Sequence, residues 1–160
     1  MSLKLPSRTD TIKVIVKADS ALKWSDSAEE NDELWASYLK SNDESLLTFE
    51  DGQQPTRFVL RNVLNYDQLQ KVKNEQMTMR DGKMEIRMSF ITEEVRQALV
   101  DIENPELTPL TDRIIFKREG DGGASKDLMA GLDAIGAVMD LYTARQNATA
   151  SFSDDLKKKS

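Results

Sequence analysis

The stretch from residue 46 to residue 64, LLTFEDGQQPTRFVLRNVL, constrains the fold more than any other part of the chain. Two runs rich in β-forming residues, 46–50 and 56–63, flank a polar connection that contains Gly52. A glycine-containing turn between two such runs is typical of an antiparallel β-hairpin. We therefore expect a β-hairpin at about 46–63 as the anchor of the fold.

The second of these runs alternates between two faces. Phe58 and Leu60 point to one side, whereas Arg57 and Arg61 point to the other. Alternation of this kind indicates a strand with one buried face. The segment 11–17 (TIKVIVK) alternates in the same way and carries lysines suited to the edge of a sheet. The expected sheet is small and antiparallel, with Phe58 and Leu60 in the core.

Helical spacing of apolar residues predicts the elements that cover this sheet. The spacing occurs at 32–40, at 66–79, at 92–102 and from 126 to about 146. Asn31, Asn65 and Ser125 precede three of these segments and are good N-cap residues. Between 84 and 91 the apolar residues fit both a helix and a short strand, and we favour the helix.

These elements predict an α+β fold, in which three or four helices pack on a small antiparallel sheet. A chain of 160 residues suits one compact domain. We place a loose N-terminus at 1–10 and the single domain at 11–146. From 147 to 160 small polar residues and then lysines replace the apolar pattern, which predicts a flexible tail.

The composition argues against most catalytic chemistry. The chain has no histidine and no cysteine, which removes the Ser-His-Asp triad, thiolate nucleophiles and zinc–thiolate sites. The net charge is −6, and the basic cluster at 157–159 is too small for a nucleic-acid footprint. No apolar run is long enough to cross a bilayer or to serve as a signal core. We expect a non-enzymatic protein that binds no cofactor, metal, nucleic acid, membrane or small-molecule substrate.

Two segments invite a functional interpretation and fit it poorly. The segment 120–126 (GDGGASK) is glycine-rich, but a phosphate-binding loop needs its lysine directly after the last glycine, and Ala124 and Ser125 intervene here. A turn followed by a serine cap is the better interpretation. The acidic cluster at 26–33 lacks the spacing and the glycine of a calcium loop, so solvated surface is favoured there.

The 46–64 stretch also carries a family resemblance. It contains the pattern L-x-F-x-x-G-x-x-P-T-x-F-x-L at Leu47, Phe49, Gly52, Pro55, Thr56, Phe58 and Leu60. With a polar strand segment before it and helices after it, the chain resembles small structural or assembly proteins from the morphogenesis region of tailed bacteriophages. The segment 95–104 and the last helix are similar in position to the later elements of such proteins. The resemblance implies a non-enzymatic role at the tail or connector, as a chaperone or a minor virion component.

We accordingly expect protein–protein interaction in the cytoplasm of a bacterial host or within the virion. The partners would be phage structural proteins and further copies of this chain. Docking would use exposed aromatic and apolar side chains, while acidic residues steer the encounter. The candidate partner-binding residues are Trp24, Trp35, Tyr38, Arg57, Arg61, Met84 and Met88. Each of them has a structural alternative, which is burial in the core or pairing with a neighbouring element.

A second function remains open from the charge pattern alone. The acidic cluster, which comprises Asp26, Glu29, Glu30, Asp32 and Glu33, is suited to mimic a polyanion. The chain would then be an acidic inhibitor or regulator that covers a basic surface of a host protein.

Overall fold

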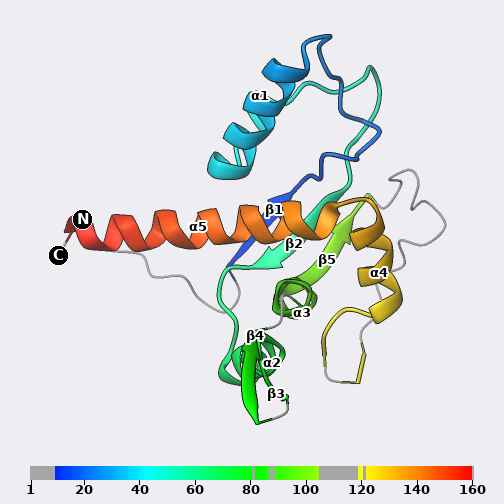
Figure 1. Ribbon diagram of the computed structural model, residues 1–160. Coiled ribbons are helices and arrows are strands. Elements are labelled where there is room, and N and C mark those ends of the chain that lie inside the picture. Colours follow the sequence, from blue (N-terminus) through cyan, green and yellow to red (C-terminus); the bar gives the residue numbers. More distant parts are fainter. Residues whose placement is uncertain (1–9, 81, 87–88, 105–118, 121, 160) are drawn as a thin grey trace.

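The computed structural model describes residues 10–80, 82–86, 89–104, 119–120 and 122–159 (Figure 1). Within these ranges the chain forms a three-stranded antiparallel sheet, a separate two-stranded hairpin and five α-helices. The predicted α+β class is confirmed, and the described part of the chain has one or two helices more than expected. The division into a loose N-terminus, one domain and a flexible tail stays a prediction.

The three-stranded sheet has the order β1-β2-β5. Strand β2 (Arg57–Arg61) lies in the centre and pairs antiparallel with β1 (Thr11–Val14) and with β5 (Leu99–Glu103). The structure therefore confirms that strands form within 11–17 and 56–63, although both strands are shorter than predicted.

The register places the alternating residues of β2 as the sequence predicts. Val14 lies opposite Phe58 and Leu60 lies opposite Leu99, with a register shift between Val59 and Leu60. Phe58 and Leu60 are fully buried. Val59 on the other face is buried as well.

The predicted hairpin at 46–63 is wrong in its first half. The run 46–50 forms no regular strand: a short 3-10 helix, η1 (Glu44–Leu46), ends at its first residue, and Phe49 forms only an isolated bridge with Leu22. Both edges of β2 are already occupied by β1 and β5, so the run 46–50 has no free edge to pair with. Its Leu47 packs instead beside Trp35 in a different cluster.

Helix α1 (Ala28–Ser41) begins four residues earlier than predicted. Its N-cap is Ser27, whose side chain accepts a hydrogen bond from the Glu30 backbone N–H at 3.3 Å. Asn31 lies inside the helix and accepts hydrogen bonds from Ser25 instead of capping. The cap was misplaced because both residues are good N-cap residues.

Helix α2 (Tyr66–Gln76) begins where predicted, and Asn65 caps it by accepting from the Gln68 N–H at 2.9 Å. It ends three residues early. Strands β3 (Met77–Arg80) and β4 (Lys83–Ile86) follow as a hairpin, so the short strand was the right alternative at 83–86 and the helix was wrong there. For β3, β4 and residues 151–159 only the backbone is described.

Helix α3 (Phe90–Ala98) passes directly into β5 at Leu99. The predicted helix through residue 102 is therefore wrong in its last turn. The spacing of Leu99 and Ile102 fits a helical stripe, but their side chains are equally buried when the segment is a strand. Pairing with β2 satisfies the backbone of this segment, and tertiary contact overrides the local preference.

The last predicted helix is two helices, α4 (Lys126–Ala134) and α5 (Ala137–Lys159). Ser125 caps α4 as expected, accepting from the Leu128 N–H at 3.2 Å. Gly136 adopts a φ of +74° at the break, a conformation that glycine reaches without strain. Helix α5 continues to Lys159 through the predicted flexible tail.

Helix α5 crosses the molecule between two packed regions, with α1 on one side of it and α2 and α3 on the other (Figure 1). The main core surrounds the sheet and includes Phe58, Leu60, Leu99, Leu132 and Leu141. Residues 15–51, here called the N-terminal lobe, have a second cluster of their own, made by Ile15, Leu22, Trp35, Tyr38 and Leu47.

Candidate functional site

The predicted aromatic residues meet inside the N-terminal lobe. The Trp35 ring lies 5.9 Å from the Trp24 ring and 5.0 Å from the Tyr38 ring. Trp35 is 6% exposed and Tyr38 is 0% exposed, while Trp24 is half-buried. These three side chains therefore build the core of the lobe, and a role in partner binding stays a prediction.

Tyr38 also supplies a buried hydrogen bond. Its hydroxyl oxygen accepts from the Ile15 backbone N–H at 2.8 Å. Burial raises the pKa of Tyr38 to about 12, because the phenolate would lose its hydration. The hydroxyl thus fixes the point where the chain leaves β1 and enters the lobe.

Arg57 and Arg61 occupy the two ends of β2. Arg57 forms a forked pair with Glu44 of η1, at 3.0 Å from Nε and 2.8 Å from Nη2. That pair raises the pKa of Arg57, and it matches the structural alternative considered for this residue. Arg61 lines a small hollow of about 170 Å³ with Asn65 and Gln68.

The side chains of the two candidate methionines lie outside what the structure describes. Met84 lies in β4, where the structure describes the backbone, and Met88 lies outside the described residues. Their part in partner binding stays a prediction.

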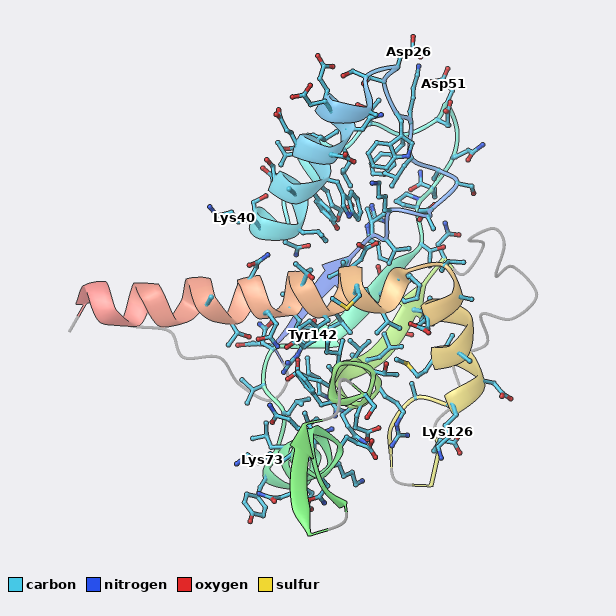
Figure 2. The ribbon with its side chains drawn as sticks, in the orientation of Figure 1. Asp26, Lys40, Asp51, Lys73, Lys126 and Tyr142 are labelled. Carbon is cyan, nitrogen blue, oxygen red and sulfur yellow. The ribbon has the colours of Figure 1, made fainter. Side chains whose placement is uncertain are left out.

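The negative charge of the chain lies in the N-terminal lobe. Residues 17–51 contain ten aspartates and glutamates and only three lysines, against a net charge of −6 for the whole chain. The rest of the sequence is therefore close to neutral. Asp26 and Asp51 lie at the end of the lobe that is far from α5 (Figure 2). Glu29, Glu30 and Glu33 of α1 are also exposed.

The lobe carboxylates do not form a metal site. Among the residues that the structure describes, no group of three acidic side chains could hold a metal ion. Asp32 pairs with Lys17 at 3.3 Å, and Glu44 pairs with Arg57. The others named above are exposed to solvent.

A polar cleft lies on the opposite side of the molecule, between α2, α3 and α4. It encloses about 450 Å³, and its charged lining includes Lys71, Glu75, Glu93, Arg96 and Lys126. The sequence did not indicate this cleft, since its residues come from separate helices and only Lys126 belongs to a segment that the sequence singled out. Their charges would have been assigned to ordinary helix surface.

Arg96 is the buried centre of the cleft. Its side chain is 8% exposed and makes two 3.0 Å contacts with Glu93 and one of 3.2 Å with the Ala124 carbonyl. Gln97 donates to the same Glu93 carboxylate at 3.0 Å. This carboxylate is thus engaged by three donors, an arrangement that favours a structural ion pair over a general base.

The glycine-rich segment borders the cleft. Glu119 accepts a hydrogen bond from the Lys126 N–H at 3.1 Å, so a carboxylate of the chain itself lies at the N-terminus of α4. Helix N-termini favour negative charge, which explains the position. With Ser125 as the cap, the segment is a turn that begins a helix, as the sequence predicts.

Close packing of Gly123 on Arg96 leads to a first prediction. A Cβ atom at residue 123 would lie 2.6 Å from the Arg96 Nη1. Gly123→Ala should therefore lower the free energy of unfolding by about 1 kcal/mol, because the pinned guanidinium must shift. Urea denaturation measures the change. Gly120→Ala is the control, since nothing lies within 4 Å of its Cβ position, and equal losses in both variants would contradict the packing argument.

Comparison of the chain with protein-family models, with curated proteins and with solved structures found no match. Within the described residues, the helices include none that combines the length and the apolar character needed to cross a membrane. The fold and the charge distribution define the chain as an α+β protein with an acidic N-terminal lobe that has its own hydrophobic cluster.

Proposed function

We propose that this chain is a non-enzymatic interaction protein whose N-terminal lobe docks on a basic surface of a protein partner. The setting that the sequence resemblance implies is assembly of a phage tail or connector. The partner would then be a phage structural protein.

The concentration of charge carries this proposal. The lobe holds essentially all of the excess negative charge, and the exposed residues of its far end come from α1 and from the loop at residue 51. A one-sided charge distribution accelerates association with an oppositely charged surface and rejects partners of like charge. The buried Trp35 and Tyr38 would support the shape of this surface from inside.

The arrangement of the cleft supports a non-enzymatic role. Glu93 is held by Arg96 and Gln97, Glu119 by the Lys126 N–H, and Glu75 accepts from Ser89 at 3.1 Å. These contacts connect α2, α3 and α4. Such a network stabilises the packing of helices and is an ordinary use of charged groups at a helix interface.

The same charge pattern also fits the second function, an acidic regulator that covers a basic surface of a host protein. The identity of the partner separates the two functions. Phage structural proteins among the captured partners favour assembly, whereas a single host protein favours regulation.

The test compares two triple variants that remove the same charge. Glu29→Gln, Glu30→Gln and Glu33→Gln neutralise the lobe, while Asp67→Asn, Asp127→Asn and Asp133→Asn neutralise exposed acids on α2 and α4. Each triple includes acids from the first turn of a helix, so dipole effects are similar. Affinity capture from lysates of phage-producing bacteria, followed by quantitative mass spectrometry, gives the readout.

The lobe triple should lose partners that the wild type and the control triple retain. With a purified partner, its association rate should fall by about tenfold, and the difference should shrink at high salt. Equal binding by both triples, or loss of binding in the control alone, would overturn the proposal that the lobe is the contact surface. Light scattering after size exclusion shows whether a second copy is among the partners.

A further inference from the structure

The N-terminal lobe is held together by its own contacts. Its segments 21–23 and 48–50 are joined by two backbone hydrogen bonds. The Lys23 N–H donates to the Thr48 carbonyl at 2.8 Å, and the Glu50 N–H donates to the Ala21 carbonyl at 2.8 Å. Helix α1 packs on these two segments through the lobe cluster around Trp35. The lobe therefore has the internal bonding of a unit that can change its position without losing its structure.

The base of the lobe is clamped where its two ends meet. The buried Asp19 accepts hydrogen bonds from the Ala21 N–H at 2.9 Å and from the Thr56 N–H at 2.8 Å. The Thr56 hydroxyl in turn donates to the Asn104 carbonyl at 2.7 Å, at the end of β5. These bonds tie the entering and leaving chain to the sheet, and the pair between Glu44 and Arg57, the residue after Thr56, joins the lobe to β2 beside them.

The flank of the lobe meets α5 at a second point, Asp140. One carboxylate oxygen of Asp140 accepts from the Trp35 indole N–H at 3.2 Å, and the other accepts from the Lys17 backbone N–H at 3.0 Å. A single side chain of α5 thus binds both α1 and the chain that enters the lobe.

Weaker contacts accompany this carboxylate. Asn147 of α5 donates to the Leu39 carbonyl at 3.1 Å, and the Leu39 side chain packs against both the lobe cluster and the main core. Leu39 is only half-buried. The polar bonds to Asp140 therefore add to this packing contact between α1 and α5.

We propose that Asp140 is a latch that docks the N-terminal lobe on α5, and that the lobe opens as a unit about the Asp19–Thr56 clamp when the latch is released. This device goes beyond the proposed function, since it concerns the position of the lobe and not the partner that the lobe binds. Opening would swing the acidic end of the lobe relative to the sheet.

The two tryptophans of the chain, Trp24 and Trp35, both lie in the lobe, so tryptophan fluorescence reports on the lobe alone. In Asp140→Ala the emission should shift to longer wavelength, because the Trp35 indole loses its acceptor and gains access to water. The Lys17 amide loses its hydrogen bond to the Asp140 carboxylate and should exchange faster by roughly tenfold or more. The amides inside α1 should stay protected, because the lobe moves as a unit. Exchange in β2 and β5 should remain as in the wild type.

The control is Asp133→Ala, which removes an exposed carboxylate from the neighbouring helix α4. Asp140→Asn keeps the size of the side chain and one acceptor, and it should give an intermediate increase in the exchange of the Lys17 amide even if Asp140→Ala fails to fold. Acceleration of α1 together with the sheet would mean that the lobe and the body open only by joint unfolding, which overturns the latch. Unchanged exchange of the Lys17 amide in Asp140→Asn would overturn it as well.

Discussion

Replacing Arg145 by methionine should lower the free energy of unfolding by about 3–5 kcal/mol, the usual result of removing one partner from a buried ion pair. The Arg145 side chain is 7% exposed and lies 3.3 Å from Glu94, which is itself 15% exposed. Burial lowers the pKa of Arg145, and the nearby Glu94 opposes that effect. In Arg145→Met the Glu94 carboxylate stays buried without its cation.

Arg145 has a second role that methionine cannot fill. Its Nε donates to the Arg61 carbonyl at 2.9 Å and its Nη2 donates to the Asn62 carbonyl at 3.3 Å. These bonds join α5 to the chain at the end of β2. The variant therefore loses the connection between α5 and the sheet along with the ion pair.

Urea denaturation measures the loss, and Lys13→Met is the matched control. Lys13 pairs with Glu103 at 2.9 Å, but its side chain is 51% exposed, so the control should lose no more than about 1 kcal/mol. The double variant Arg145→Met, Glu94→Met should recover part of the stability, because no buried charge is left unpaired. A similar loss in Arg145→Met and Lys13→Met would contradict the argument from burial.

The elements that the sequence predicted well depend on local signals. The alternation at 57–61 produced a strand with Phe58 and Leu60 buried, and the caps at Asn65 and Ser125 began helices where expected. Each signal acts within a few residues of its own position. Tertiary contacts did not need to override them.

The errors occurred where a distant partner decided the structure. The run 46–50 has the composition of a strand, but β1 and β5 had already filled both edges of β2. The segment 99–103 fits a helical stripe, and only pairing with β2 made it a strand. Pairing between strands so far apart in the chain leaves no trace in the spacing of either one.

The burial of the polar sites also depends on distant parts of the chain. Arg96 and Arg145 are ordinary residues of amphipathic segments until the fold buries them beside Glu93 and Glu94. Adjacent glutamates on a helix point apart, and here each one serves a different arginine. The spacing of Glu93 and Arg96 on one helix is compatible with an i,i+3 pair, whereas Glu94 and Arg145 are far apart in the sequence and only the fold brings them together.

Replacing Tyr38 by phenylalanine should lower the free energy of unfolding by about 1–3 kcal/mol at neutral pH, most of it the cost of an unsatisfied buried donor. The variant keeps the ring in the lobe core, but it leaves the buried Ile15 N–H without its 2.8 Å acceptor. Tyr66→Phe is the control, since Tyr66 is 72% exposed and should change stability by less than about 0.5 kcal/mol.

The effect of Tyr38 should also depend on pH. Its pKa is about 12 in the folded protein, against the ordinary value of 10.0 for an exposed tyrosine. Between these values the unfolded chain releases the phenol proton while the folded chain retains it, so rising pH favours unfolding. The stability that the neutral phenol contributes is complete below pH 10 and is lost as the pH rises toward 12.

The difference in unfolding free energy between the wild type and Tyr38→Phe should therefore be constant below pH 10 and shrink above it. Phenylalanine has no proton to lose, whereas lysines and the other tyrosines titrate alike in both proteins and cancel from the difference. Urea denaturation at a series of alkaline pH values measures it, and tyrosinate absorbance follows ionisation in the folded state. A constant difference across this range would mean that the Tyr38 hydroxyl ionises in the lobe as readily as in water, which would contradict the effect of its burial.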